Sequence, residues 1–422
     1  MREAVVDQQL AALARRDSTV RAFVCLDAAG ARRRALAATG PFAGVLIGVK
    51  DIIATAEFPT RYGMDVDDAG PREDAWCVAR IRQLGGTVLG KTVCTAFAYP
   101  LPGPTTNPHD VTRTPGGSSS GSAAAVAAGF VSFALGTQTA GSTIRPASYC
   151  GVTGFKPSYG LMPLDGVQAI STTLDHLGLF AHSPRDAWYL ASAMIMPQAE
   201  VVTARRPRRL LVLRFPPELP VSADYVGRLE ALADTLRGEA IEVNTRDLPF
   251  PMDDFRSLQS ELCYWEAARI LLSPGRVRPV PELQALLAPY RDRDVALYAA
   301  ARRRRGAYRA QFTALVAGYD AVMLPAATGV APPVADTGDA VMNRFWTALH
   351  VPAITIPMWR SGDGLPLGLQ LLSGLGTDRA LIEVAQWIFE RPPRHCEERS
   401  DEAIQPVGAR PSWIASSLRS SQ

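Results

Sequence analysis

The chain contains no run of about 18 apolar residues, no CxxC cysteine pair and little net charge. Without such a run, it lacks a segment long enough to cross a bilayer as a helix. The N-terminal stretch MREAVVDQQL also lacks the apolar core of a signal peptide. A formal net charge of +3 gives no electrostatic reason to expect a nucleic-acid partner. These absences predict a cytoplasmic protein that binds neither membranes nor nucleic acids.

The cysteines are few and scattered, and their spacing fits neither a zinc site nor a disulfide framework. They are predicted to be small, buried hydrophobic residues with free thiols. The six are Cys25, Cys77, Cys94, Cys150, Cys263 and Cys396.

Hydrophobic residues make up 47% of the 422 residues, which is enough for a large core. A helix expected over 74–86 separates two apolar strand-like segments, so helices and strands alternate in the N-terminal part. Because strands are expected near both ends of the chain, we predict a single α/β domain over residues 1–390. The expected strands are 45–49, 87–91, 131–139, 209–213, 241–244, 321–326, 351–358 and 365–372.

The middle of the chain, about residues 200–320, is predicted to be mainly helical, with one long helix over 293–318. Four consecutive arginines, 302–305, fall on this helix. A solvated helix face is favoured there over an RNA-binding patch. Residues 391–422 have no periodicity and are rich in Arg, Ser and Pro, which predicts a loosely ordered tail outside the domain.

The segment 116-GGSSSGSAAAVAAGF-130 permits three interpretations. It could be a phosphate-binding loop at a helix N-terminus, but no GK[ST] follows. It could be a G-x-S-x-G nucleophile elbow centred on Ser119, but prolines in 107–117 argue against the strand that an elbow requires. The downstream histidines stand in no context that suggests a triad. Thirdly, it could belong to a catalytic core that is completed elsewhere in the chain.

A second glycine- and serine-rich turn supports the third interpretation. It is 136-GTQTAGSTIRPASYCG-151, with Ser142 at its tip, and it follows a predicted core strand. Lys50 ends another predicted strand, in 48-GVKDI-52. Serines on turns and a lysine at a strand end suggest a Ser–Lys nucleophile system that needs no histidine.

At these residues the chain resembles the amidase signature family. The resemblance spans about residues 1–390 and implies a mixed sheet flanked by helices on both sides. It also implies hydrolysis of a C–N amide bond without metal or cofactor. The matching segments are 44-GVLIGVKD-51, 90-GKT-92, 115-PGGSSSGSAAAVAAG-129, 136-GTQTAGSTIRPASYCG-151, 154-GFKPSYG-160 and 365-LPLGLQLL-372.

The resemblance places the family's Ser–cis-Ser–Lys triad on Ser142 as nucleophile, Ser118 as proton relay and Lys50 as base. Lys50 can accept a proton only when neutral, and burial without a facing carboxylate would lower its pKa. Asp51 should point to the opposite side of the strand. The remaining serines of the first loop, Ser119 among them, are expected to be turn and helix-cap hydroxyls.

The resemblance also implies a cis peptide bond between Gly117 and Ser118. The second turn offers successive backbone N–H groups to a tetrahedral oxyanion. These expected donors belong to Thr139, Ala140, Gly141 and Ser142.

Arg145 follows Ser142 by three residues, as in malonamidase-like members of the family. It could clamp a substrate carboxylate or form a structural ion pair beneath the site. We therefore expect an amidase that cleaves a small-molecule amide, with a homodimer as the commonest soluble assembly. The alternative is the glutaminase (A) subunit of a tRNA-dependent amidotransferase. A catalytically silent binding protein is disfavoured because all three triad residues are present.

Overall fold

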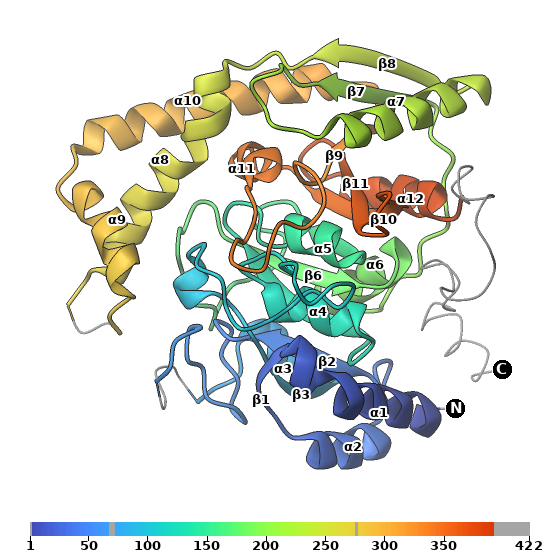
Figure 1. The fold of residues 1–422 in the computed structure, drawn as a ribbon, viewed down its shortest axis with the longest axis vertical. Coiled ribbons are helices and arrows are strands. Elements are labelled where there is room, and N and C mark those ends of the chain that lie inside the picture. Colours follow the sequence, from blue (N-terminus) through green and yellow to red (C-terminus); the bar gives the residue numbers. More distant parts are fainter. Residues whose placement is uncertain (1, 67–71, 275–276, 392–422) are drawn as a thin grey trace.

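A computed structural model describes residues 2–66, 72–274 and 277–391. Its centre is one mixed sheet of eleven strands in the order β1-β3-β2-β4-β6-β5-β10-β11-β9-β7-β8 (Figure 1). The strands are β1 (Phe23–Leu26), β2 (Leu46–Lys50), β3 (Thr87–Thr92), β4 (Phe133–Gln138), β5 (Thr153–Lys156), β6 (His176–Ala181), β7 (Arg209–Arg214), β8 (Glu242–Asp247), β9 (Ala321–Pro325), β10 (Ala353–Arg360) and β11 (Pro366–Leu372).

The two halves of the chain meet in the middle of this sheet. Strand β5 pairs antiparallel with β10, with Phe155 opposite Ile354. On the N-terminal side, β2 lies parallel to both β3 and β4. This pairing confirms the prediction of a single α/β domain, because neither half could complete the sheet alone.

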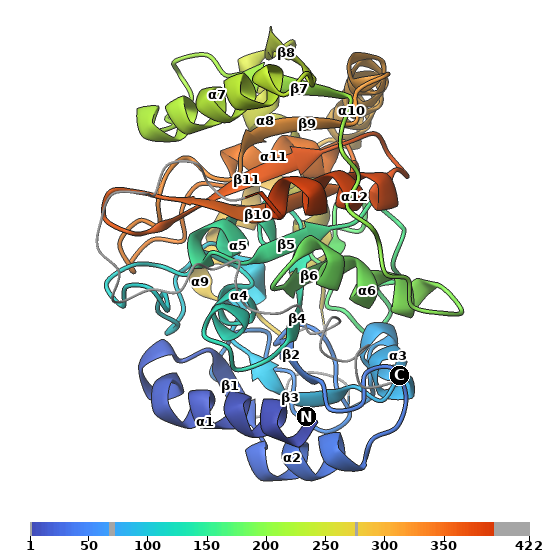
Figure 2. The ribbon, with the colours of Figure 1, turned by 90° about the vertical axis from the view of Figure 1, so that its right-hand side faces the viewer.

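Helices cover both faces of the sheet (Figure 2). On one face α4 contacts α5 and β4, and on the other α6 contacts α3, α12 and β6. The α-helices are α1 (Arg2–Val20), α2 (Ala28–Ala37), α3 (Trp76–Gln83), α4 (Ser120–Ala127), α5 (Ile144–Cys150), α6 (Pro184–Ile195), α7 (Ala223–Gly238), α8 (Met252–Leu271), α9 (Pro281–Arg291), α10 (Val295–Val316), α11 (Val341–Ala348) and α12 (Asp378–Phe389).

Several helix starts follow directly from the sequence. Ser183 caps α6 by accepting a hydrogen bond from the N–H of Asp186, and Pro184 stands at the first position of that helix. Asp294 caps α10 in the same way, through the N–H of Ala296. Such side chains satisfy N–H groups that have no partner inside the helix.

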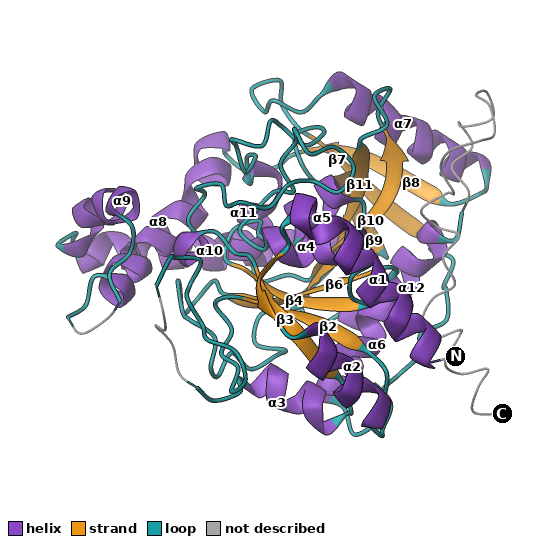
Figure 3. Ribbon diagram, turned by 60° about the horizontal axis from the view of Figure 1, so that its bottom comes forward, coloured by secondary structure: helices purple, strands orange, loops and turns teal. Residues whose placement is uncertain are grey.

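Helices α8, α9 and α10 form an arm that extends to one side of the sheet (Figure 3). The prediction of a solvated arginine face on α10 is only partly correct. Arg302 and Arg303 are exposed. Arg304, however, pairs with Glu261 of α8, and Arg305 is only 8% exposed because its side chain reaches the 171–175 loop.

The five cysteines in the described part of the chain have free thiols, and all except the half-buried Cys25 are buried, as predicted. Cys396 and the predicted tail lie outside the described residues, apart from Arg391. Within the described ranges, no helix combines the length and the apolar character needed to span a membrane.

Candidate active site

Lys50 and Ser118 are brought together although 68 residues separate them. Lys50 is the last residue of the buried strand β2, and its Nζ lies 2.7 Å from Ser118 Oγ. A second hydroxyl, Thr137 Oγ1 at the end of β4, lies 2.8 Å from the same Nζ. Because β2 and β4 are parallel neighbours, their carboxyl ends deliver both side chains to one edge of the sheet.

Burial lowers the pKa of Lys50 to about 8, because the ammonium form loses its hydration inside the protein. The predicted orientation of Asp51 is confirmed. Its carboxylate accepts hydrogen bonds from the N–H groups of Arg61 and Gly63. It also lies 3.6 Å from the buried ammonium of Lys91. Lys50 is therefore left with hydroxyl partners and no ion pair among the described residues.

The first glycine- and serine-rich loop contains the cis peptide bond between Gly117 and Ser118. Its other hydroxyls anchor the loop to the sheet. Ser119 Oγ donates to the carbonyl of Thr137, and Ser122 Oγ donates to that of Leu135. Ser119 stands at the N-cap of α4 but its side chain makes no capping bond, so the helix-cap role expected for it is wrong.

Ser142 lies on the turn between β4 and α5. It is 8% exposed, and its hydroxyl forms no hydrogen bond with another described residue. Helix α5, which directly follows this turn, packs against the Ser118 loop, since a Cβ on Gly116 would lie 2.9 Å from Pro146 Cα. Ser142 and Ser118 thus occupy neighbouring loops, with only the Ser118–Lys50 pair joined by a hydrogen bond.

Residues 139–142 carry the N–H groups expected from the sequence to act as oxyanion donors, and are called the oxyanion loop below. This loop is held by its carbonyl groups. Gln259 Nε2 donates to the Thr139 carbonyl at 2.9 Å, and Thr347 Oγ1 donates to the Ala140 carbonyl at 2.6 Å. The Gly141 carbonyl accepts the N–H of Arg145. Within the described part of the chain, none of the backbone N–H groups of 140–142 donates a hydrogen bond.

This arrangement orients the N–H groups. In a trans peptide the C=O and the following N–H point in opposite directions, so fixing one fixes the other. The carbonyls of Thr139, Ala140 and Gly141 therefore aim the N–H groups of Ala140, Gly141 and Ser142. Successive N–H groups without partners beside a serine can stabilise a developing oxyanion.

Arg145 points toward backbone carbonyls. Its Nη2 donates to Gly117 O at 2.6 Å and its Nη1 donates to Gly338 O at 2.7 Å. The side chain is buried and forms no ion pair with a described carboxylate. The structural ion pair, one of the two alternatives considered for Arg145, is therefore not what the structure shows. Two of the guanidinium nitrogens are already bonded to backbone carbonyls.

Asp175 and Gln138 support the same turn, and the sequence alone did not identify either role. Asp175 Oδ1 accepts a hydrogen bond from Thr139 Oγ1 at 2.5 Å, and burial raises the pKa of this carboxyl to about 6. Gln138 Oε1 accepts the N–H groups of Thr143 and Ile144. Local patterns carried no signal for these contacts because each depends on the folded turn.

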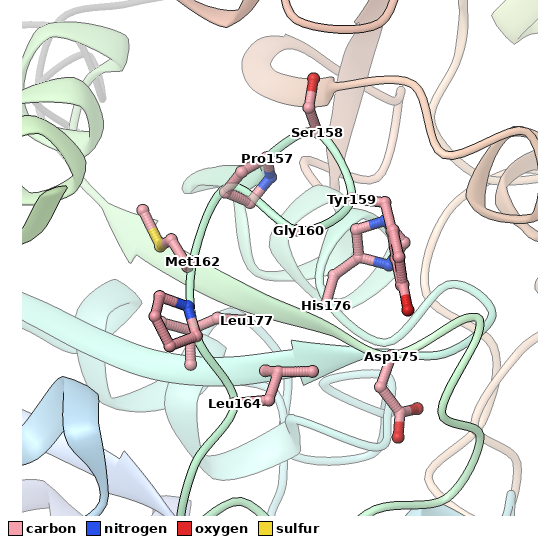
Figure 4. Close-up of a pocket in the computed structure, with 10 residues that line it drawn as sticks. Pro157, Ser158, Tyr159, Gly160, Met162, Leu164, Asp175, His176 and Leu177 are labelled. Carbon is pink, nitrogen blue, oxygen red and sulfur yellow. The ribbon is translucent and has the colours of Figure 1, made fainter.

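A pocket of about 260 Å³ lies at the start of β6, and Asp175 is one of the residues that line it (Figure 4). Tyr159, Asp175 and His176 form its polar wall. His176 is buried, and its Nδ1 lies 2.6 Å from Leu174 O. Its Nε2 has no hydrogen-bond partner among the described residues. Ser142, the nucleophile expected from the sequence, is not among the residues that line this pocket.

Comparison with known proteins identifies the family. The family model described as Amidase matches residues 4–215. The A subunit of glutamyl-tRNA(Gln) amidotransferase from Acidothermus cellulolyticus is 30% identical, over 90% of this chain and 89% of its own length.

Solved structures agree. One described as a crystal structure of amidase superposes with a TM-score of 0.82 at 27% identity, over 92% of this chain and 95% of that chain. The A subunit of glutamyl-tRNA(Gln) amidotransferase from Thermotoga maritima superposes with a TM-score of 0.78 at 25% identity, over 93% and 92%. The chain belongs to the amidase signature family and is an enzyme that acts on C–N bonds.

Proposed function

We propose that Ser142 is the nucleophile of an amide hydrolase, with Ser118 as proton relay and Lys50 as general base. The proposal rests on one contact: Ser118 Oγ lies 2.7 Å from Lys50 Nζ. Burial lowers the pKa of this lysine to about 8. A lysine of ordinary pKa would be almost entirely protonated at neutral pH and could not accept a proton.

In the first step Ser142 Oγ attacks the amide carbonyl carbon, and its proton passes through Ser118 to Lys50. The N–H groups of the oxyanion loop donate to the negatively charged oxygen of the tetrahedral intermediate. The C–N bond then breaks, and the proton returns through the relay to the departing amine. Water attacks the resulting ester by the same proton path, which frees the carboxylic acid and restores Ser142.

Two substrate classes compete. The sequence favoured a stand-alone amidase for small amides, but the relatives named above favour the alternative, a glutaminase subunit. We therefore propose glutamine as the leading substrate, with partner subunits of an amidotransferase receiving the ammonia. The small-amide assignment stays as the second candidate, supported by the fold match to the structure described as an amidase.

Ammonia release by the purified enzyme tests both assignments. The panel contains glutamine, malonamate, and neutral aliphatic and aryl amides, with Ser142→Ala as the blank. Glutamine turnover that rises when the partner subunits are added supports the glutaminase. Turnover of small amides, unchanged by those subunits, supports the stand-alone amidase instead.

The site assignment has its own control in the first loop. Ser142→Ala is expected to abolish turnover, whereas Ser119→Ala should retain most of it, because Ser119 is bonded to strand β4. The reverse pattern would contradict the triad and restore the nucleophile elbow.

A further inference from the structure

We propose that helix α8 of the arm positions the oxyanion loop, through Gln259 directly and through Glu266 by way of the 171–175 loop. The proposal rests on the function proposed above, because it assigns both residues a part in amide hydrolysis. It gives a role to the middle segment of the chain, for which the sequence indicated none. Both side chains are 4% exposed.

The direct contact is the hydrogen bond from Gln259 Nε2 to the Thr139 carbonyl. Since the Thr139–Ala140 peptide is planar, this bond sets the direction in which the Ala140 N–H points. Without the donor, the buried carbonyl would have to turn toward another partner. The Ala140 N–H would then turn with it, away from the oxyanion.

The second path begins at Glu266, whose carboxylate binds the loop that precedes β6 through several hydrogen bonds. It accepts hydrogen bonds from Ser171 Oγ at 2.7 Å, from the Thr173 N–H at 3.0 Å and from Thr173 Oγ1 at 2.6 Å. Tyr298 of α10 donates to the same carboxylate at 2.7 Å. Glu266 therefore ties the loop to both long helices of the arm.

The loop passes this restraint to the site. Asp175 Oδ2 accepts the N–H groups of Ile170 and Ser171, while Asp175 Oδ1 accepts the hydroxyl of Thr139. Thr139 is consequently held at its carbonyl by Gln259 and at its side chain by Asp175. Both restraints lead back to α8, so displacement of this helix would disturb the oxyanion loop in two ways.

Gln259→Leu removes the donor and keeps a side chain of similar size. Removing a complete oxyanion donor lowers kcat by roughly 100- to 1,000-fold, so misaiming one N–H is expected to lower kcat about tenfold. KM should stay within about twofold, because the donor acts mainly on the transition state. The matched control is Gln284→Leu, which removes a similar glutamine-to-carbonyl bond, to Pro279 O, at the arm helix α9.

Glu266→Gln is the conservative second variant and is expected to lower kcat about three- to tenfold. Its control is Glu261→Gln on the same helix, which breaks only the pair with Arg304. A double-mutant cycle between Gln259→Leu and Thr139→Val adds a readout that a general loss of stability would not produce. A non-additive effect on kcat in this cycle would mean that the hydrogen bonds from Thr139 to Gln259 and to Asp175 restrain the same loop.

Each outcome decides between the two proposals. If the wild-type enzyme hydrolyses no amide of the panel, the proposed function fails and this inference fails with it. If the wild type is active and both variants keep kcat within about twofold of their controls, only the inference is overturned. The inference is supported if kcat falls in the variants while KM stays unchanged. It also requires that the effects of Gln259→Leu and Thr139→Val on kcat are not additive in the double mutant.

Discussion

The Lys50 amine and the Ser118 hydroxyl lie 2.7 Å apart, and no described carboxylate forms an ion pair with that amine. The fold thus places a lysine where its charged form is poorly solvated, beside a hydroxyl that can pass it a proton. Asp51, the neighbouring residue, is instead turned toward Lys91. Because the Asp51 carboxylate faces Lys91 and not Lys50, it does not stabilise the charged form of Lys50. A lysine can act as a base only when its neutral form is accessible in this way.

The pH dependence of turnover follows from this environment. The pKa of Lys50 is lowered to about 8, and only its neutral form accepts a proton. We predict that kcat/KM rises as pH increases through about 8 and then reaches a plateau. A pH–rate profile on one amide substrate measures this. A rate that falls across the same interval would contradict Lys50 as the base.

Thr137 is predicted to orient Lys50. Thr137→Val removes the hydroxyl 2.8 Å from Nζ and keeps the shape of the side chain, so kcat should fall about tenfold as the amine loses one of its two hydroxyl partners. Steady-state kinetics beside a melting curve separate this effect from unfolding. Thr235→Val, at a half-buried position of α7, is the control and should leave kcat unchanged.

Arg145 is predicted to act on the Ser118 loop and not on substrate charge. Arg145→Lys cannot reproduce both bonds to the Gly117 and Gly338 carbonyls, so turnover of acidic and neutral amides should fall by similar factors. Parallel kinetics on malonamate and on a neutral amide check this. A rise in KM confined to malonamate would show instead that Arg145 clamps a substrate carboxylate.

Gly136 on β4 is predicted to be required for packing beneath the first loop. A methyl group there would meet Phe180 Cε2 at 2.6 Å and Ser119 Oγ at 2.7 Å, so Gly136→Ala should lower the free energy of unfolding by about 1–3 kcal/mol. Denaturant unfolding measures the change. Gly227 lies on helix α7, and a methyl group added there would have no other atom within 4 Å. Gly227→Ala should therefore raise the free energy of unfolding by up to about 1 kcal/mol.

A long helix and a core strand were predictable from the sequence, whereas one short, buried helix was not. The helix expected over 293–318 is α10, and the strand expected over 365–372 is β11, each within two residues. By contrast, the sequence predicts a turn over 136–151, whereas Ile144–Cys150 within it is helix α5. Every residue of α5 is buried, so it has no polar face and no amphipathic pattern to reveal it.

The sequence by itself determined the alternation of strands and helices and indicated that Lys50, Ser118 and Ser142 lie on turns or strand ends. These features depend on local composition and spacing, which a short segment carries within itself. Only the tertiary structure decided what surrounds those residues. Asp175 and Gln259, respectively 36 and 120 residues from Thr139, both bond to it. Such contacts arise from the packing of distant elements, which no local pattern encodes.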